Sequence, residues 1–579
     1  MIEYILKDEM PDNCRRQYDK LGISRRFGQI LYNRAIMPRD ADRLLNNPLA
    51  LIDDMPDNIY GAKEAALKIL ENLANGAKFL VFADYDVDGM VSGYIMTDFL
   101  RKVGADIYCY YPERSEGYGL SMEFAKAIDY DDGPWCVITV DNGITALEPI
   151  EYIISKGIDV VVTDHHEPGI ELPNCTVCDP WIDRNHGTHL CGAGVAWKIC
   201  MLMESVLEET TSALTLTEEY IPFLGIATIA DVMPMSLENR AIIKLALEKM
   251  NSNDPGTYIS ILKKMFSLYN VTAKDIGWTI APVLNGASRM GDTQSAAKSF
   301  YETDEDDLSE TFIKLNKYNR SRKTLQDKAV KEATKNDYTN DNIILFDASA
   351  YPPGLYGIVA SKLAELNKKP AIVYCSDDSN ILSGSCRTYG DIDIKSLINI
   401  EAVKGNAYGA AGHHNACGCN LMKDKLDDFK QGVHDSLNGI YPEELLKVES
   451  KILQPVDHQD IPDSLNDIQV DCEIIPAEIT ADLLFEINQI PFYKDEPLFI
   501  LRDMPVDMMH PFKNKNHLVL KLGNTVALGW NMTELFPGIE NASKINILGK
   551  ISTAGFSAKY FGLNRYDAIL MIENIDIVE

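Results

Sequence analysis

The sequence predicts an α/β protein in which a parallel-sheet domain, a helical region and a second, smaller α/β domain precede a small C-terminal β-barrel. Three apolar, β-rich runs alternate with helical patterns early in the chain, at residues 78–83, 136–140 and 158–163. This alternation is typical of βαβ units, and near-continuous hydrophobic strands are typical of a sheet that is buried on both faces. A second α/β pattern opens with the strand expected at 342–346, and short β runs follow residue 495.

These patterns divide the chain into five parts. A chain of 579 residues has room for several domains of roughly 100–200 residues each. We expect a helical N-terminal lead-in, the first α/β domain, a helical connecting region, the second α/β domain, and an acidic linker followed by the barrel, at residues 1–60, 61–235, 236–338, 339–445 and 446–579. The short strands near the C-terminus fit a barrel of the OB kind.

The composition favours a protein of the cytoplasm. Hydrophobic residues make up 46% of the chain, and none of its apolar runs approaches the ~20 residues needed to cross a bilayer. The first ten residues contain early acids and no long apolar core, so they do not resemble a secretory signal. The 12 cysteines are scattered and are expected to be reduced thiols. We expect a soluble protein with no membrane partner.

The strong negative charge restricts how the protein could bind nucleic acid. The formal net charge is -31, and a field of that sign repels phosphate groups. Basic residues concentrated in one place, or divalent cations held by carboxylates, could offset the repulsion. One helical segment is rich in basic residues: Lys314, Lys317, Arg320, Arg322, Lys323, Lys328, Lys331 and Lys335. This segment either lines a path for nucleic acid or is an ordinary solvated helix.

Acidic and imidazole side chains follow the predicted strands of the first domain. The set consists of Asp84, Asp86, Asp88, Asp141, Asp164, His165 and His166, with Asp231 at the end of the apolar stretch 223–230. The carboxyl ends of parallel strands meet at one edge, where ligands bind. A single aspartate there could be only a helix N-cap, but several together would repel one another without cations. Mixed carboxylate and imidazole ligands favour Mn²⁺ or Mg²⁺ over zinc.

The runs around these residues resemble the motifs of DHH phosphoesterases. Four runs are similar to the four motifs of that superfamily: VFADYDVDGMVSG (81–93), VDNGI (140–144), TDHHEP (163–168) and IADVMPM (229–235). Three further segments resemble RecJ-type exonucleases, which are specific for single-stranded DNA, at residues 112–120, 285–290 and 315–320. The resemblance identifies the first α/β domain with the DHH domain and covers most of the chain.

The resemblance implies a pair of divalent cations, Mn²⁺ or Mg²⁺, and a set of residues that hold them. Five side chains match the metal-ligand positions of the family: Asp86, Asp88, Asp141, His165 and Asp231. Asp84 and His166 complete the expected catalytic set, either as further ligands or as groups that orient a ligand or the phosphate. His166 is the candidate for contact with the scissile phosphate.

The second α/β domain resembles the DHHA1 domain, which would bind the far side of the substrate. Its GSGRS motif is GSCRT here (384–388), and its GGHxxAAG motif begins at Ala411. The family histidine of GWHxG is replaced by Pro352. Arginine can hold a phosphate with two hydrogen bonds. The expected substrate-binding residues of the whole chain are Arg114, Tyr118, Arg289, Arg320, Ser385, Arg387 and His413.

By resemblance, the chain would be a metal-dependent exonuclease that hydrolyses single-stranded DNA from 5′ to 3′ and releases 5′-mononucleotides, in DNA repair and recombination. It would act as a monomer, with a single-strand-binding protein and a RecQ-type helicase as partners. Two alternatives stay open. One is a nanoRNase or cyclic-dinucleotide phosphodiesterase of the same superfamily, which the extra length disfavours. The other is a nuclease-dead replication scaffold, which the intact carboxylate cluster disfavours.

Overall fold

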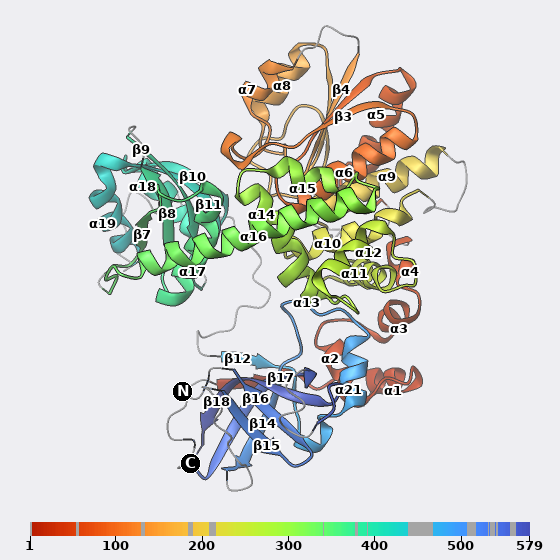
Figure 1. Ribbon diagram of the computed structural model, residues 1–579, viewed down its shortest axis with the longest axis vertical. Helices are drawn as coiled ribbons and strands as arrows, with labels where there is room; N and C mark the ends of the chain where they lie inside the picture. Colours follow the sequence, from red (N-terminus) through yellow and green to blue (C-terminus); the bar gives the residue numbers. More distant parts are fainter. Residues whose placement is uncertain are drawn as a thin grey trace. The chain divides into compact units, whose positions relative to one another are not determined.

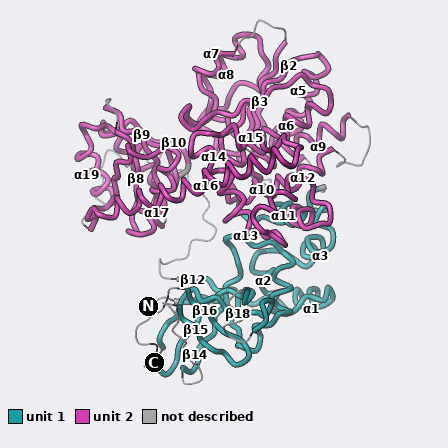
Figure 2. The backbone as a smooth tube through the Cα atoms, in the orientation of Figure 1, with its two compact units in different colours: residues 1–55, 234–245, 458–579 teal, residues 56–233, 246–457 magenta. Residues whose placement is uncertain are grey.

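The computed structural model divides into two compact units, which are described separately (Figure 2). Unit 1 contains residues 1–55, 234–245 and 458–579, and unit 2 contains residues 56–233 and 246–457. The structure describes residues 3–53, 57–128, 134–182, 189–207, 216–339, 341–376, 380–390, 392–437, 467–506, 517–530, 532, 539, 542–555 and 563–578. Most of the predicted acidic linker lies outside the described residues.

Unit 2 begins with a five-stranded sheet in the order β3-β2-β4-β5-β6. All four strand pairings are parallel. The strands are β2 (Lys78–Phe82), β3 (Asp106–Tyr110), β4 (Trp135–Val140), β5 (Asp159–Thr163) and β6 (Thr176–Cys178). The predicted parallel sheet is therefore confirmed, and the three runs that predicted it are β2, β4 and β5.

Helices cover both faces of this sheet (Figure 1). They are α5 (Ala62–Ala74), α6 (Val87–Lys102), α7 (Met122–Ala127), α8 (Leu147–Ser155) and α9 (Gly192–Leu207). On the face of α7 and α8, the buried residues Ile150 and Ile153 pack with Val137 and Val160. On the other side, α9 packs against both α5 and α6, and all three helices pack against the sheet. Because the sheet is buried on both faces, the sequences of these strands are continuous apolar runs.

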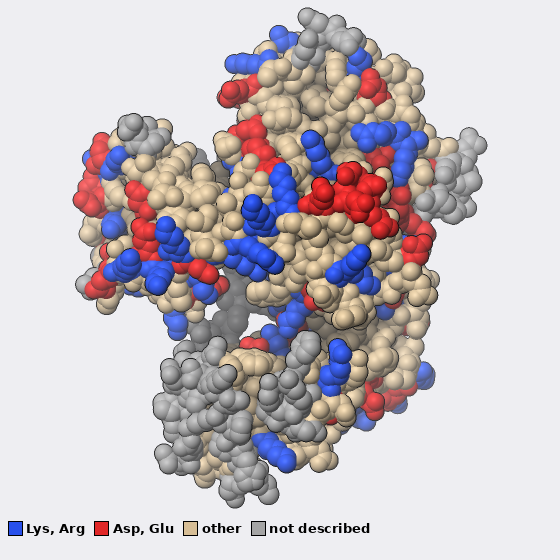
Figure 3. Space-filling model, viewed as in Figure 1, with Lys and Arg blue, Asp and Glu red and all other residues tan. Residues whose placement is uncertain are grey.

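A helical region follows the first sheet. Its helices are α10 (Ile221–Ala230), α11 (Leu237–Met250), α12 (Thr257–Phe266), α13 (Ala273–Asp275), the π-helical turn Ile276–Ile280, α14 (Ala281–Arg289), α15 (Thr293–Ser299) and α16 (Glu305–Ala333). Acidic side chains gather over the first turns of α16, and basic side chains lie farther along it (Figure 3). None of the helices in the described part of the chain is long and apolar enough to span a membrane.

The second sheet of unit 2 has the order β10-β11-β9-β8-β7. Its strands are β7 (Ile344–Asp347), β8 (Ala371–Ser376), β9 (Ile381–Arg387), β10 (Ala407–His413) and β11 (Ala416–Met422). Only the pair β7 and β8 is parallel among these described strands, and the other pairs are antiparallel. The helix α17 (Tyr356–Asn367) packs on one face, and α18 (Ile394–Val403) and α19 (Leu426–Leu437) pack on the other.

Unit 1 joins the two ends of the chain. The strand β1 (Glu3–Leu6) pairs in parallel with β12 (Asp467–Val470). A six-stranded sheet follows in the order β13-β14-β17-β18-β16-β15, formed by Cys472–Glu473, Phe499–Pro505, Lys544–Thr553, Ala568–Ile577, Thr525–Gly529 and Leu518–Leu522. In the described part of unit 1 the two outer strands, β13 and β15, do not pair, so a closed OB-like barrel is not confirmed.

The helices of unit 1 come from both ends of the sequence. They are α1 (Asp12–Lys20), α2 (Arg25–Tyr32), α3 (Pro38–Asn46), α4 (Leu49–Asp53) and α21 (Ala481–Asn488). The expected helical lead-in is therefore largely helical, but it begins with the strand β1 and belongs to the same unit as the C-terminal sheet. The segment 234–245, which carries Arg240, is the third part of this unit.

A buried group of charges connects the three segments of unit 1. The Arg34 guanidinium donates two hydrogen bonds to the Asp471 carboxylate, at 2.8 and 3.1 Å, and another to the Asp495 carbonyl at 2.7 Å. Arg240 pairs with the carboxylate of Asp495 and donates to the carbonyl of Pro491 at 2.6 Å. The Phe492 ring lies 5.0 Å from the Arg34 guanidinium and 5.1 Å from that of Arg240.

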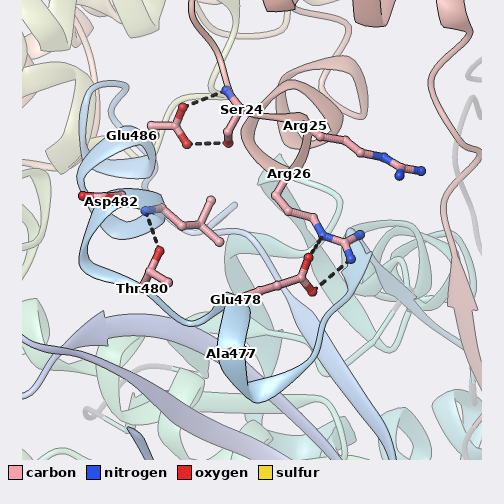
Figure 4. A pocket seen from close by; sticks show the side chains of 9 residues that line it. Ser24, Arg25, Arg26, Ala477, Glu478, Thr480, Asp482 and Glu486 are labelled. Atoms are coloured by element: carbon pink, nitrogen blue, oxygen red, sulfur yellow. Dashed lines mark hydrogen bonds and ion pairs between the residues drawn. The ribbon is translucent and has the colours of Figure 1, made fainter. Parts of the chain in front are cut away.

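A separate hollow of about 380 Å³ lies in unit 1 (Figure 4). Two of its carboxylates are satisfied within the chain. Arg26 donates two hydrogen bonds to Glu478, at 2.8 and 3.0 Å, and the Glu486 carboxylate accepts from the backbone N–H and hydroxyl of Ser24 (Figure 4). The hollow contains none of the predicted site residues, so it is not the predicted site.

We expect Asp471→Ala to lower the free energy of unfolding of unit 1 by about 3–5 kcal/mol, because it leaves the Arg34 guanidinium buried without its partner. Hydrogen exchange of peptides from unit 1 would measure the loss. The exposed Asp482→Ala on α21 is the matched control, and equal protection in the two variants would contradict the role of the Arg34 pair.

The same interaction has a pH dependence. Burial opposes ionisation of Asp471, but the hydrogen bonds from Arg34 outweigh it and hold the pKa of this carboxyl below its usual value. Its stabilising contribution is therefore complete above the pKa of the unfolded chain, and it is lost as the pH falls through the folded pKa. The Asp471→Ala variant should accordingly lose less stability on acidification than the parent protein.

Candidate active site

Four aspartates form a row at the carboxyl edge of the first sheet. The register pairs Phe82 with Thr139, Val140 with Thr163, and Thr163 with Cys178. Each of the four strands then continues into an aspartate at the same level, so that Asp84, Asp141, Asp164 and Asp179 are neighbours. Their exposed fractions are 4%, 2%, 1% and 0% respectively. Four buried carboxyl groups side by side are unfavourable unless something compensates their charge.

Asp179 is the member of the row that the sequence analysis missed. It follows β6, which has only three residues, so the apolar run before it is too short to predict a strand. Its carboxylate accepts the backbone N–H of Trp181 at 2.8 Å, and burial followed by the charge of Asp164 raises its pKa to about 8. The signal for Asp179 that the sequence did contain is an aspartate directly after a short run with β-branched residues.

Asp86 and Asp88 are placed by the helices that begin beside them. Asp86 caps α6 by accepting the backbone N–H groups of Asp88 and Gly89, at 2.9 and 3.2 Å. Asp88 accepts the N–H groups of Gly192 and Ala193 at the start of α9, at 2.6 and 2.9 Å. Asp86 therefore is an N-cap, and these hydrogen bonds hold both carboxylates still at the edge of the sheet.

His165 lies at the centre of the carboxylates. Its Nε2 is 3.0 Å from Asp141 Oδ1, 3.6 Å from Asp88 Oδ2 and 3.8 Å from Asp231 Oδ2. Asp231 follows the last residue of α10, at its C-cap. Three sets of potential ligand atoms lie within 4.8 Å of one another: Asp141, His165 and His166; Asp88, His165 and Asp231; and Asp84, Asp86 and Asp141. The structure therefore brings all seven predicted catalytic residues into one site.

The electrostatics of this site call for cations. Burial, followed by the charge of Asp86, raises the pKa of Asp84 to about 8 and that of Asp88 to about 6. Burial and the charge of Asp88 also raise the pKa values of Asp141 and Asp231 well above their usual range. Within the described residues, the buried Oδ1 of Asp84 has no hydrogen-bond partner. Oxygen ligands with one imidazole fit a pair of Mn²⁺ or Mg²⁺ ions.

His166 is oriented by Asp164 and Tyr118. Its Nδ1 lies 2.8 Å from Asp164 Oδ1, and the Tyr118 hydroxyl lies 3.0 Å from the same ring nitrogen. Burial lowers the pKa of His166, but the hydrogen bond and charge of Asp164 outweigh it and raise the pKa to about 9. Asp164 also accepts the backbone N–H groups of Ile144, at 3.0 Å, and of His165, at 2.7 Å. The Asp164 carboxylate therefore organises the loop that carries both histidines.

Three arginines gather on one side of this site. Arg114 lies 4.1 Å from the centre of the Tyr85 ring and donates to the Ser288 hydroxyl at 3.2 Å. Arg289 donates to the carbonyl of Gly354 at 3.0 Å. Burial, followed by the charge of Arg114, lowers the pKa of Arg289 to about 9.

The third arginine, Arg387, is affected in the same direction. Burial comes first among the causes that lower its pKa, and the charge of Arg114 adds to it. A Cβ added to Gly357 would lie 2.9 Å from Arg387 Nη2, so the guanidinium rests against the start of α17. Mutual repulsion among Arg114, Arg289 and Arg387 makes this region a favourable place for an anion.

The remaining predicted substrate-binding residues lie on two elements. Ser385 is on β9, two residues before Arg387 and opposite Val373. Arg320 is exposed on α16. His413 is the last residue of β10, where it pairs with Ala416, but its side chain is outside the described part of the structure.

Gly192 is another residue that the sequence analysis missed. A Cβ at this position would lie 2.6 Å from both Cβ and Oδ1 of Asp141, so only glycine fits. Asp141 itself has a left-handed backbone with φ 62°, a conformation that a non-glycine residue rarely adopts. The signal was present in the glycine-rich start of α9, at residues 192–194.

Comparison with family models agrees with this architecture. The DHH family, N-terminal domain model matches residues 78–228, and the DHHA1 domain model matches residues 340–439. The two matches contain the first sheet and the second sheet of unit 2, respectively. The chain therefore contains a DHH domain followed, after the helical region, by a DHHA1 domain.

Comparison with individual proteins shows which DHH proteins the chain is similar to. The chain is 27% identical to the single-stranded-DNA-specific exonuclease RecJ of Bacillus subtilis over 590 residues, which covers 98% of this chain and 70% of the relative. It is also 27% identical to the RecJ of Thermus thermophilus, over 85% of this chain and 68% of that protein. With its DHH and DHHA1 domains, the chain is similar to RecJ-type proteins over most of its length.

A solved structure has the same fold. The crystal structure of RecJ in complex with Mn²⁺ from Thermus thermophilus matches with a TM-score of 0.79 and 22% sequence identity, over 100% of this chain and 80% of that chain. The match includes the C-terminal part of the chain, in which a closed barrel is not confirmed for the described residues.

We expect Gly192→Ala to weaken Mn²⁺ binding on the order of 10- to 100-fold, as changes beside a metal ligand do, because the added methyl group displaces Asp141. Isothermal titration calorimetry would measure the affinity. Gly169→Ala is the matched control, since its Cβ would make only an ordinary contact at 3.7 Å. Equal affinities in the two variants would contradict the placement of Asp141 at the cations.

Proposed function

We propose that this protein is a metal-dependent exonuclease that hydrolyses the phosphodiester bonds of single-stranded DNA. The observation that carries the proposal is the convergence of Asp88, Asp141 and Asp231 around His165, within 3.8 Å of its Nε2. The names of the RecJ relatives, which are single-stranded-DNA-specific exonucleases, support the reaction and the substrate. The similarity to a RecJ crystallised with Mn²⁺ supports the metal.

The residues that would hold the cations are Asp86, Asp88, Asp141, His165 and Asp231, with Asp84 at the same edge. When bound, two Mn²⁺ or Mg²⁺ ions supply Lewis acidity that polarises the phosphate and makes a water molecule nucleophilic at neutral pH. The hydrogen bonds that Asp86 and Asp88 accept from backbone N–H groups keep these carboxylates in place before metal arrives. A site held in this way needs little rearrangement to bind its cations.

His166 contacts the scissile phosphate in this proposal. Its ring is fixed by Asp164 and by the Tyr118 hydroxyl, and the Asp164 carboxylate favours the protonated, cationic form. A cationic imidazole donates a strong hydrogen bond to a nonbridging phosphate oxygen and stabilises the charge that develops there. Tyr118 positions this ring and lies beside the substrate.

The three gathered arginines hold the strand end. Arg114, Arg289 and Arg387 repel one another, and a phosphate relieves that repulsion while accepting paired hydrogen bonds. Ser385 and His413 extend this region on the DHHA1 sheet, and Arg320 guides the strand along α16. A site for a terminal 5′-phosphate fits digestion from 5′ to 3′ with release of 5′-mononucleotides, the direction that the RecJ resemblance implies.

The cellular role follows from the same resemblance. We propose that the protein acts in DNA repair and recombination, as a monomer in the cytoplasm, together with a single-strand-binding protein and a RecQ-type helicase. The C-terminal sheet of unit 1 would act as an OB-like module for single strands. The five proposed domain boundaries, at residues 1–60, 61–235, 236–338, 339–445 and 446–579, remain our interpretation of how these tasks are divided.

Asp141→Ala should reduce the cleavage of end-labelled single-stranded DNA with Mn²⁺ by at least about 100-fold, because it removes a proposed metal ligand. The matched control is Asp106→Ala, which removes an exposed aspartate at the start of β3, at the amino end of the sheet. Substrates labelled at the 5′ or the 3′ end give the direction, and comparison with a dinucleotide tests the nanoRNase alternative. Full activity in Asp141→Ala would rule out the proposed site.

Arg387→Ala should raise KM for a 5′-phosphorylated single strand by about 10-fold or more, with a smaller change in kcat, because a hydrogen bond to a charged group contributes about 1.5–3 kcal/mol. A comparison of DNA strands with and without the 5′-phosphate distinguishes loss of this contact from general damage to the enzyme. Lys362→Ala, an exposed change on α17, is the control. An unchanged KM for the phosphorylated strand would refute the role of Arg387.

A further inference from the structure

Two cysteines of the DHHA1 sheet face each other across neighbouring strands. β9 and β11 are antiparallel, and their register places Cys386 directly opposite Cys417. A third cysteine of the same sheet, Cys419, lies opposite Gly384 instead. All three are free thiols in the structure. Opposite residues of an antiparallel pair have Cα atoms about 4.5–5.5 Å apart, which is within the range that a disulfide bond requires.

Both of these cysteines stand where the DHHA1 motifs have a small residue. The glycine of GSGRS is Cys386 in the run GSCRT, and the second alanine of GGHxxAAG is Cys417. These two departures from the DHHA1 motifs therefore lie side by side, because Cys386 and Cys417 form one cross-strand pair. Neither thiol is needed for hydrolysis in the proposed function, so the pair requires its own explanation.

The surroundings give the two thiols different reactivities. A hydrogen bond with Cys386 lowers the pKa of Cys417 despite its burial, and the charges of Arg387 and Lys395 act in the same direction. Burial raises the pKa of Cys386 well above its usual range. Cys417 is 4% exposed, whereas Cys386 is fully buried. Both thiols belong to the buried core of this sheet. Cys417 is the less buried of the two and has the more positively charged surroundings, so we expect an oxidant to attack it first.

We propose that Cys386 and Cys417 are a redox modification site, at which a hydroperoxide such as hydrogen peroxide produces a reversible disulfide. The Cys417 thiolate attacks one peroxide oxygen, which forms a sulfenic acid and releases hydroxide. The Cys386 thiol then attacks the Cys417 sulfur, the S–S bond forms, and the sulfenic oxygen leaves Cys417 as water, taking up the proton of the Cys386 thiol. Protonation of the hydroxide gives a second water, so the two thiols are oxidised as one peroxide is reduced to two waters.

The disulfide would act on the strand-end site through Arg387. This residue follows Cys386 directly, and its Nη1 donates to the Cys386 carbonyl at 2.7 Å. A covalent bond between the two side chains constrains β9 at Cys386 and shifts that carbonyl, and the guanidinium moves with it. This consequence rests on the proposed function of Arg387. We expect the oxidised protein to have a KM for a 5′-phosphorylated single strand several-fold higher than the reduced protein.

Peptide mapping tests the modification without reference to nuclease activity. The reduced full chain is treated with hydrogen peroxide, its remaining thiols are alkylated, and the protein is digested without reductant for mass spectrometry. We expect a linked Cys386–Cys417 peptide that dithiothreitol removes. Cys417→Ala should abolish the link, and Cys419→Ala, the matched control from the same strand, should keep it. A Cys386–Cys419 link, or sulfinic acid at Cys417 with no link, would overturn the proposal.

The kinetic measurement then tests the consequence separately. KM is compared for the reduced, oxidised and re-reduced forms of the parent protein and of Cys417→Ala. A rise in KM that dithiothreitol reverses, and that Cys417→Ala does not show, supports control of the strand-end site. A linked peptide with an unchanged KM overturns that control, whereas absence of any nuclease activity in the reduced protein overturns the proposed function and leaves the peptide result to decide the modification.

Discussion

The crowding of carboxyl groups at one edge of a buried parallel sheet is the constraint on which the first domain depends. Asp84, Asp141, Asp164 and Asp179 extend four adjacent strands, and each is at most 4% exposed. Burial separates such charges from water, and their mutual repulsion adds to the cost. A fold that keeps this arrangement must supply opposite charge, either from its own backbone and side chains or from bound cations.

The chain meets this requirement in two ways. Asp164 is satisfied internally, because it accepts three backbone N–H groups and the imidazole of His166. Asp84 has a buried oxygen without a hydrogen-bond partner among the described residues, and Asp141 and Asp231 are only partly compensated by His165. Asp164 is thus fully satisfied within the chain, whereas Asp84 and Asp141 of the same row are not. This difference in hydrogen bonding explains how aspartates in one row can have different roles.

Much of this arrangement could be predicted from the sequence, because parallel strands align their ends. The runs before Asp84, Asp141 and Asp164 are long and apolar, so both the strands and their shared edge were visible. Asp179 was not, since its strand has three residues. Gly192 was missed because its importance lies in a 2.6 Å approach to Asp141, a contact between residues 51 positions apart in the numbering. Local patterns do not encode such distances.

The prediction of a C-terminal barrel shows a different limit of inference from the sequence. The β runs after residue 495 were found, but strand pairing decides whether a sheet closes, and the described strands form an open order from β13 to β15. The pairing of β1 with β12 joins residues more than 450 positions apart, which no local pattern could reveal. The acidic residues that marked a linker also gave no sign that Asp471 binds Arg34.

The three-segment composition of unit 1 has a consequence for how the chain acquires its structure on the ribosome. Its residues 1–55 emerge before unit 2, yet their partners, in the segment from residue 458, emerge after it. The early segment must wait until unit 2 has been translated before it can pack against its partners, while unit 2 can already form its own core. Slow closure of so long a loop is inherent in this topology, and it makes the nascent N-terminal segment a natural client for chaperones.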